Sequence, residues 1–382
     1  MSVPKLPAAI YIDNTNDLRT LVQRLSQETL IALDTESNSM HAYRGRVCLV
    51  QLSTRQQDYI IDPLAIDDMQ PLGDLLLNPA IEKIFHAAEY DLICMQRDFD
   101  FGIANVFDTM LAARVLGIPS VGLGDMLHEF FDVTVDKRHQ LDDWGQRPLP
   151  QDSLIYAQMD THYLPRLRDA LEERLIKTGH LEEAQEVFRD LMLIDVEEKA
   201  FDPDGYWKIG RPRALNRREM TFLKELYLVR DAIAQEEDVP PYKVFTNKTM
   251  IYMAQRPPAN LTDLFNLRDL SGYYVREYGS DILEAIERAQ DNKPPRPPRV
   301  ERRKPIIVER YSALHAWRKE TAEQRAIDSS LVLPKQILWT IAEEMPLNMN
   351  ALSAINGMGE WRLNQYGEAI LDVIHQMNGS SS

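Results

Sequence analysis

Residues 30–37 read LIALDTES, and this stretch decides the fold of the first part of the chain. Four apolar residues predict a strand that enters the interior, yet two carboxylates, Asp34 and Glu36, follow in the same run. Side chains two apart in a strand lie on one face, so both acids are expected to point the same way. Two like charges held together cost free energy unless cations approach them. Taken alone, the stretch fits a strand that ends in a solvated turn; the alternative, a divalent-metal site, requires partners elsewhere in the chain.

Further strands and helices are predicted beyond this stretch. Runs rich in Ile, Val, Leu and Tyr between polar turns predict strands, and apolar residues that recur at spacings of three and four predict helices. Because the strands come early and the helices dominate later, we expect an α/β domain of about two hundred residues, with a mixed sheet flanked by helices. The predicted strands are 9–14, 29–36, 46–54, 57–62 and 81–86, and the predicted helices are 15–27, 88–98, 107–116, 123–131, 152–173 and 180–199.

Two later segments supply the partners that Asp34 and Glu36 require. The segment IFHAAEYDLICM, 84–95, predicts a strand that runs into a helix, with Asp91 in the first turns of that helix. Alone, Asp91 would be explained by the helix dipole, which favours acids near a helix N-terminus. In QDSLIYAQMD, Tyr156 and Asp160 are four residues apart and therefore share one helical face. Tyr156 alone would be a core tyrosine, but an acid on an otherwise apolar face requires a partner.

Together the four acids Asp34, Glu36, Asp91 and Asp160 make chemical sense as a cation site. Four converging carboxylates would repel one another, and two Mg²⁺ or Mn²⁺ ions about 3.5–4 Å apart would neutralise them. Such a pair activates a water on one side of a phosphodiester and stabilises the leaving oxygen on the other. Tyr156, one turn before Asp160, stands where a hydroxyl can orient the attacking water. The predicted chemistry is phosphodiester hydrolysis.

From about residue 214 the strand signal disappears, and the chain repeats itself at an offset of 88 residues. The best-matched block aligns YGSDILEAI, 278–286, with YGEAILDVI, 366–374. Two copies of one small helical domain explain the repeat. Between them, the prolines of KPPRPPRVERRKP, 293–305, predict an extended spacer. Its six basic residues stand against a single acid, so a phosphate contact is the alternative to a solvated linker.

The five residues of the predicted site, in this order and these contexts, resemble the three exonuclease motifs of the tyrosine-containing branch of the DEDD superfamily. The stretch KRHQLDDWGQRPLPQDSLIYAQMD, 137–160, is similar to the run into the third motif. With two helical repeats behind the exonuclease domain, the chain resembles the ribonuclease D family, whose C-terminal modules are HRDC domains. The resemblance implies an exonuclease domain over 1–205, a first HRDC-like domain over 212–291, a Pro/Arg-rich linker over 292–306 and a second HRDC-like domain over 307–378.

The resemblance also implies a fold, an activity and a role for each site residue. The fold would be RNase H-like, and the activity would be removal of nucleotides from a 3′ end with release of 5′-monophosphates, using two divalent metal ions. Asp34 would bridge both ions, and Glu36 and Asp160 would hold the ion that activates water. Asp91 would serve the second ion, and Tyr156 would position the nucleophile.

Two positions depart from the family pattern. Ser37 stands where many relatives have an aromatic residue after the first motif, which leaves open what packs against the terminal base. Pro150 stands where the family often has a helix-capping serine, and proline suits a first helical position.

The composition indicates how many domains the chain has and whether it contains membrane spans, disulfides or zinc sites. With 382 residues, 44% hydrophobic and 27% charged, the chain has the composition of a soluble protein of two or three domains. No apolar run approaches the roughly 20 residues that span a bilayer, and MSVPKLPAAIYIDN has no basic segment followed by an apolar one, so we expect a cytoplasmic protein with no membrane contact. Cys48 and Cys94 have no spacing that indicates a disulfide framework or a zinc site.

The net charge of −16 lies entirely in the first half of the chain. Residues 1–200 hold 18 Lys and Arg against 34 Asp and Glu, whereas 201–382 hold 25 against 25. Since an acidic half repels a polyanion, bound metal and local basic patches would have to attract a nucleic acid. Weaker candidates for substrate contact are His86, Lys137, Arg138, Trp144, Arg147, Tyr242, Lys243, Lys248 and Lys335, each of which also has a purely structural or solvated explanation.

The leading hypothesis is therefore a monomeric, metal-dependent 3′–5′ exoribonuclease that acts on RNA 3′ ends such as those of tRNA precursors. The alternative is the same chemistry on DNA, because two-metal hydrolysis does not itself require a 2′-hydroxyl. A third hypothesis is a catalytically silent binding scaffold. The presence of all five site residues argues against it, since a scaffold has no need for four converging acids.

Overall fold

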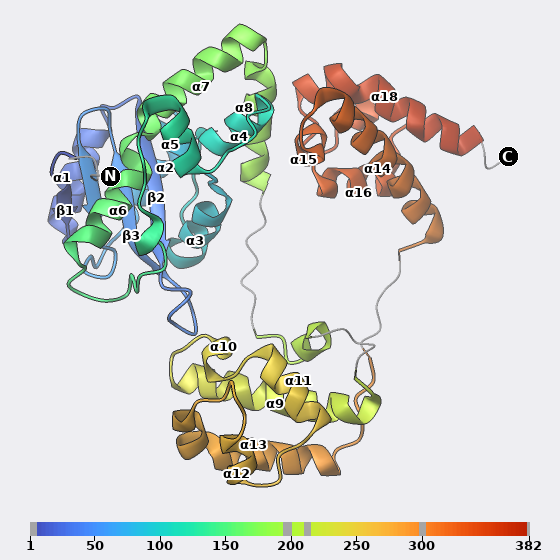
Figure 1. Cartoon of the computed structure of the whole chain (residues 1–382). Helices are drawn as coiled ribbons and strands as arrows, with labels where there is room; N and C mark the ends of the chain where they lie inside the picture. The colour runs from blue at the N-terminus through green and yellow to red at the C-terminus, as the bar shows by residue number, and fades with distance from the viewer. Residues whose placement is uncertain (1–5, 194–200, 210–214, 298–302, 380–382) are drawn as a thin grey trace. The chain divides into compact units, whose positions relative to one another are not determined.

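The structure is a computed structural model that describes residues 6–193, 201–209, 215–297 and 303–379 (Figure 1). It divides into two compact units, which are described separately. The first unit contains residues 6–36, 47–193 and 303–379 within these ranges. The second contains residues 37–46, 201–209 and 215–297.

A six-stranded mixed sheet forms the centre of the α/β part of the first unit. A mixed sheet was predicted, but with five strands, and β6 was not among them. The strand order is β1-β4-β3-β2-β5-β6. Strands β3 and β4 are antiparallel, whereas β1–β4, β2–β5 and β5–β6 are parallel. The strand β2, which contains LIALDTES, lies in the interior of the sheet. The bounds are β1 (Ile10–Ile12), β2 (Leu30–Ser37), β3 (Val47–Ser53), β4 (Asp58–Ile61), β5 (Glu82–Phe85) and β6 (Val106–Asp108).

Helices cover both faces of this sheet, and they differ from the predictions at three places. α2 was not predicted. The helix predicted over 152–173 is two helices, because Pro165 has no backbone N–H to continue the ladder and starts a new helix instead. The helix predicted over 180–199 ends as α8 at Asp190, and a 3₁₀ turn follows over Leu191–Leu193. Residues 194–199 of this prediction lie outside the described residues. The bounds are α1 (Thr15–Leu25), α2 (Gln70–Leu77), α3 (Glu89–Phe99), α4 (Thr109–Val115), α5 (Leu123–Phe131), α6 (Gln151–His162), α7 (Leu164–Thr178) and α8 (Leu181–Asp190).

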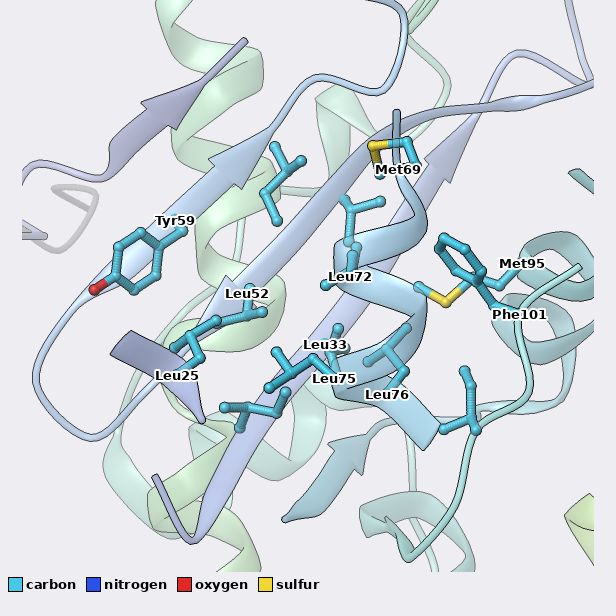
Figure 2. Packing of buried hydrophobic residues seen from close by; sticks show 14 of the residues in the cluster. Leu25, Leu33, Leu52, Tyr59, Met69, Leu72, Leu75, Leu76, Met95 and Phe101 are labelled. Carbon is cyan, nitrogen blue, oxygen red and sulfur yellow. The ribbon is translucent and has the colours of Figure 1, made fainter. Parts of the chain in front are cut away.

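The two faces of β2 belong to different apolar clusters. Ile31 and Leu33 pack with side chains of α1, α2 and α3, and Figure 2 shows Leu33 and Leu52 of the sheet beside the leucines of α2. Leu30 and Ala32 pack instead with side chains of α4, α7 and α8. Because side chains alternate along a strand, Asp34 and Glu36 continue the face of Leu30 and Ala32. β2 runs on to Ser37, so the two acids lie within the strand and not at its end.

The second helical domain belongs to the same compact unit as the sheet, and it contacts α8. The Glu186 carboxylate accepts hydrogen bonds from the backbone N–H groups of Trp361 (3.0 Å) and Arg362 (3.2 Å). The Arg362 guanidinium donates to both oxygens of Asp190, at 2.8 and 2.6 Å. The helices of this domain are α14 (Pro305–Arg325), α15 (Ser329–Val332), α16 (Lys335–Glu344), α17 (Met349–Ser353) and α18 (Glu360–Gly379).

The second unit is the first helical domain together with residues 37–46, the segment that follows Glu36. Tyr43 of this segment donates from its hydroxyl to Asp231 (2.9 Å) and from its backbone N–H to Asp238 (3.1 Å). Besides a 3₁₀ turn over Gly205–Lys208, the helices are α9 (Arg217–Glu236), α10 (Pro241–Val244), α11 (Asn247–Gln255), α12 (Leu261–Phe265) and α13 (Gly272–Asp291).

The internal repeat is confirmed by equivalent contacts in the two helical domains. Arg230 is buried and donates to the carbonyl of Phe245, and Arg318, 88 residues later, is buried and donates to the carbonyl of Leu333. The extended spacer predicted over 293–305 is wrong at Pro305, which begins α14 because a first-turn proline needs no N–H partner. Residues 298–302 of that spacer lie outside the described residues. No helix of the described ranges has the length and apolar character needed to cross a bilayer.

Candidate active site

Three of the predicted site residues meet at one point of the first unit. Asp34 and Glu36 come from β2, and Asp160 comes from the last turn of α6. One carboxylate oxygen from each of the three residues lies within 4.8 Å of the others. All three side chains are partly buried. This spacing allows one ion to contact all three carboxylates, and every donor is an oxygen atom, as hard divalent cations prefer.

Packing of α6 on the sheet holds Asp160 in this position. Ala157 of α6 is fully buried with Leu49 of β3 and Ile60 of β4. Trp144, in the loop before α6, is 1% exposed and completes this cluster, so it is a packing residue. Pro150 precedes the helix as its N-cap residue and is not its first helical residue. The register of α6 on the sheet therefore points Asp160 toward β2.

Asp91 approaches the same strand from the opposite side. It is 5% exposed and lies in the first turn of α3. Its carboxylate accepts a hydrogen bond from the hydroxyl of Thr35, the residue between Asp34 and Glu36. Asp91 is therefore not part of the three-carboxylate group, although its charge affects Asp34 more than any other charge does.

Sequence reasoning missed two residues that orient Asp91. Thr35 is the first. It could have been predicted from the alternation of side chains along β2, which turns Thr35 toward the face on which α3 packs. Asp108 is the second: it is 1% exposed and accepts hydrogen bonds from the backbone N–H groups of Ala88 (2.7 Å) and Leu111 (2.9 Å). It thereby fixes the turn that leads into α3. Its position at a strand-to-helix junction is typical of a helix-capping acid.

Burial and the neighbouring acids raise the pKa values of all four acids. Burial, then the charges of Asp91, Asp160 and Glu36, raise the pKa of Asp34 well above its usual value. Burial and neighbouring acids raise the pKa of Glu36 to about 9. Burial also raises the pKa of Asp91 to about 7, against the hydrogen bonds from Thr35, and it raises the pKa of Asp160 to about 7.

None of the four acids has an ion-pair partner among the residues that the structure describes. Buried carboxylates are normally paired with cations or hydrogen-bond donors. Four of them together without a Lys or Arg is the pattern expected where a bound ion supplies the positive charge.

Tyr156 stands one turn before Asp160 on α6. Burial, followed by the charges of Asp160, Glu36 and Asp34, raises the pKa of its hydroxyl, so the phenol stays protonated and can donate a hydrogen bond. The ring lies 6.2 Å from that of Trp144 and 6.5 Å from that of His139, between centroids. It lines a cavity of about 160 Å³ together with residues such as Arg138, His139, Asp152 and Met159.

A small polar network beside Tyr156 was also missed. His139 Nδ1 lies 2.8 Å from the Asp142 carboxylate, which also accepts a hydrogen bond from the Ser153 hydroxyl at 2.6 Å. The charge of Asp142 contributes to the raised pKa of Glu36. No motif in the sequence indicated this network, because its members come from a loop and the start of α6.

Most of the weaker candidates have structural partners. Arg147 donates to both oxygens of Asp62, each at 2.6 Å, and to the carbonyl of Cys48 at 2.7 Å, so its donors are occupied. His86 Nδ1 lies 2.9 Å from the Thr109 hydroxyl, and burial lowers its pKa to about 4, so the ring is neutral.

Two further candidates, Arg138 and Tyr242, also have partners, and the side chain of a third, Lys137, is not described. Arg138 is exposed and pairs with Asp136. The side chain of Lys137 lies outside the described residues. Tyr242 donates from its hydroxyl to the carbonyl of Met40 at 3.0 Å, within the second unit.

Comparisons with known proteins agree with this arrangement. A model of the 3′–5′ exonuclease family matches residues 9–176, and a model of the HRDC domain matches residues 219–286 and 308–374. Ribonuclease D of Gluconacetobacter diazotrophicus is 34% identical over 288 residues, which cover 74% of this chain and 72% of that protein. The exosome complex exonuclease RRP6 of Saccharomyces cerevisiae is 30% identical over 299 residues, which cover 74% of this chain. This chain spans 41% of the length of that protein and 33% of the Caenorhabditis elegans exosome component 10 homologue, to which it is 35% identical.

Solved structures show the same fold. The catalytic core of RRP6 from Trypanosoma brucei superposes with a TM-score of 0.69 at 31% identity, and the match covers 76% of this chain and 83% of that one. Escherichia coli RNase D superposes with a TM-score of 0.67 at 25% identity, over 97% of this chain and 99% of that one.

The fold and the acidic site define a 3′–5′ exonuclease domain followed by two HRDC domains. Exonucleases of this family depend on divalent metal ions. The chain belongs to the ribonuclease D family of exoribonucleases.

Proposed function

We propose that this chain is a 3′–5′ exoribonuclease that hydrolyses phosphodiester bonds and releases 5′-monophosphates with the help of two divalent metal ions. The observation that carries the proposal is the group formed by Asp34, Glu36 and Asp160, whose carboxylate oxygens lie within 4.8 Å of one another. Among the described residues no cation balances them. A group of this kind is unfavourable for stability and is therefore explained by function.

The donor set fits Mg²⁺ or Mn²⁺, which take carboxylate oxygens, better than zinc or copper, which favour nitrogen and sulfur. Asp34, Glu36 and Asp160 would hold the first ion, and Asp34 with Asp91 would hold the second. When bound, such a pair of ions supplies an activated water and stabilises the leaving oxygen. Tyr156 would orient the attacking water with its protonated hydroxyl, since its raised pKa keeps the proton in place.

Two further residues would act by positioning Asp91. The Thr35 hydroxyl donates to the Asp91 carboxylate, and Asp108 holds the turn before α3. Both contacts set the direction in which Asp91 presents its oxygens to the second ion.

The proposed substrate is the 3′ end of RNA, with tRNA precursors and other stable RNAs as the natural targets of a monomeric cytoplasmic enzyme. Support comes from the names of the relatives, a ribonuclease D and the E. coli RNase D, which is described as an exoribonuclease involved in structured RNA processing. DNA remains the second candidate substrate, because the carboxylates would hold ions that activate a water, and this chemistry does not itself require a 2′-hydroxyl on the sugar.

A direct assay tests the proposal. Wild type, Asp34→Asn and Tyr156→Phe are incubated with 3′-extended RNA and matched single-stranded DNA in Mg²⁺, Mn²⁺ or EDTA, and the released nucleotides are identified. The matched control is Asp132→Asn, which removes a carboxylate that is 97% exposed and outside the site. We expect wild type and the control to release 5′-monophosphates from RNA only with metal. The proposal is wrong if wild type degrades neither polymer, and the site is wrong if Asp34→Asn is as active as the control. Faster degradation of DNA would establish the second candidate substrate.

A further inference from the structure

The solvent face of α11 in the first helical domain carries a row of three side chains at four-residue intervals. Lys248, Tyr252 and Arg256, called the α11 stripe below, are all exposed, and the Tyr252 side chain is 44% exposed. Residues four apart lie on one side of a helix. The Arg256 guanidinium lies 5.1 Å from the centre of the Tyr252 ring, so the row continues past the helix end. The opposite face packs into the domain core through Thr249, Met250, Met253 and Ala254.

No acid lies near the α11 stripe in the sequence. From Val239 to Thr262 the chain contains no Asp or Glu, but it contains Lys243, Lys248 and Arg256. Neither lysine has an ion-pair partner among the residues that the structure describes, whereas Arg288 of the same domain pairs with Glu225 and Glu284. The stripe therefore keeps its positive charge available, although the chain as a whole carries −16.

The second helical domain shows that the fold does not require this stripe. At the offset of 88 residues, its equivalents on α16 are Gln336, Thr340 and Glu344. These three residues line a cavity of about 380 Å³ next to Asp190 of α8, so this face of α16 borders the exonuclease domain. The same helical position thus borders a partner domain in one copy. In the other copy it is exposed, basic and aromatic.

We infer that the α11 stripe binds single-stranded RNA, with a base stacked on Tyr252 and the phosphates on either side contacted by Lys248 and Arg256. An aromatic ring between cations is the arrangement that proteins use for unpaired nucleotides, because every base has a stacking face and every linkage carries a negative charge. A duplex would not offer an unstacked base to the ring. The inference rests on the proposed function, since the RNA that the stripe would bind is the proposed substrate.

The repeat supplies the variant that tests this inference. The triple substitution K248Q/Y252T/R256E installs the residues that α16 has at the same positions, so the helix and its packing face are retained. Binding of a fluorescein-labelled single-stranded RNA of about 20 nucleotides is measured by anisotropy in the Asp34→Asn background, at several salt concentrations. We expect the Kd to rise by about tenfold or more and its salt dependence to become shallower.

Hydrolysis assays separate this inference from the proposed function. In the otherwise wild-type enzyme, kcat/KM for the long strand is expected to fall at least about tenfold more than kcat/KM for a dinucleotide, and mostly through KM. Lys319→Gln, which removes an exposed cation of the second helical domain, is the control and should leave both values within about twofold. Dinucleotide hydrolysis by wild type tests the proposed exonuclease activity. The Kd for the long strand in the Asp34→Asn background tests RNA binding by the α11 stripe.

Single substitutions test the stacking itself. Tyr252→Phe retains the ring and should bind the long strand as wild type does, whereas Tyr252→Thr should weaken binding. If the triple variant binds the long strand as tightly as wild type, the inference is overturned. This result is expected if the α11 stripe binds an acidic protein and not RNA. If the triple variant is weak but Tyr252→Thr binds as wild type does, the stripe holds phosphates and the stacking is overturned.

Discussion

Two clusters of buried and partly buried acids are balanced differently in this molecule. In the candidate active site three carboxylates converge and Asp91 lies on the other side of the same strand, and among the described residues none of the four acids has a cation partner. On α8, Glu183 is 0% exposed and accepts a hydrogen bond from Arg325 at 2.7 Å, and Asp190 accepts two from Arg362. Both clusters are acidic and both lie in the first unit. They differ in whether the chain itself supplies the positive charge.

This difference separates a functional cluster from a structural one. Where the chain supplies the cations, as on α8, the acids join the second helical domain to the exonuclease domain. Where it does not, burial and mutual repulsion raise the pKa of each acid, and this cost is explained if an external cation completes the site. Four experiments, from the largest expected effect to the smallest, test this contrast.

Asp34→Asn should have the largest effect of the four, and we expect this effect on catalysis. Because Asp34 is the acid shared by both proposed ions, kcat/KM on RNA should fall by about a thousandfold or more. In metal-free buffer the same substitution should leave stability unchanged or raise it, since it removes one of four mutually repelling charges. The checks are single-turnover kinetics and urea unfolding in EDTA, with Asp132→Asn as the control. A variant that loses stability without metal as well as activity would contradict the contrast.

Arg362→Met should have the next largest effect, and on stability. Arg362 is 0% exposed, and its loss leaves Asp190 on α8 without its cation and leaves Glu186 with the exposed Arg189 alone. Breaking a buried ion pair from one side costs about 3–5 kcal/mol. Urea unfolding and the rate of tryptic cleavage measure this loss of stability, and Lys319→Met, a substitution of an exposed residue, is the control. A loss below about 1 kcal/mol would mean that α8 does not depend on these charges.

The pH dependence of stability should separate the two clusters next. The pKa values of Asp91 and Asp160 are raised to about 7 in the folded protein, so these acids keep their protons there while the unfolded chain has already lost them. Without metal, this contribution is fully present below pH about 4 and is lost as the pH rises to about 7, at about 1 kcal/mol per unit for each group. Saturating Mg²⁺ should abolish the decline.

Unfolding free energies in EDTA and in Mg²⁺, at several pH values, provide this measurement. Asp160→Asn is the matched variant and should show a shallower decline in EDTA. An EDTA profile of wild type that rises between pH 4 and 7 by the same amount as the profile in Mg²⁺ would show that the raised pKa values are wrong.

Thr35→Val should have the smallest effect. It removes the hydroxyl that orients Asp91 but keeps the shape of the side chain, so we expect kcat/KM to fall by about tenfold and the Mg²⁺ concentration for half-maximal rate to rise. Thr35→Ser, which retains the hydroxyl, should restore most of kcat/KM and most of the wild-type Mg²⁺ dependence. If Thr35→Val lowers the rate at every Mg²⁺ concentration by the same factor, Thr35 is not acting through the second ion.

Much of the site could be predicted because its chemistry is local. Alternation in LIALDTES put Asp34 and Glu36 on one face, and the four-residue spacing put Tyr156 with Asp160. The structure brings Asp34, Glu36 and Asp160 together as expected. Asp91 lies outside this group and accepts a hydrogen bond from Thr35, because α3 packs on the other face of β2.

The sequence by itself determined the strands and helices with clear periodicity, the two copies of the helical domain and the residue types of the active site. Local patterns were too weak for the three-residue strand β6 and for α2, and they did not show the break before Pro165. Only the tertiary structure decided which acids are paired. Asp190 and Arg362 are 172 residues apart, and Thr35 and Asp91 are 56 apart. No local pattern encodes such contacts, because they depend on how helices pack on a sheet, and this packing decides which acids the chain neutralises and which it leaves for a metal ion.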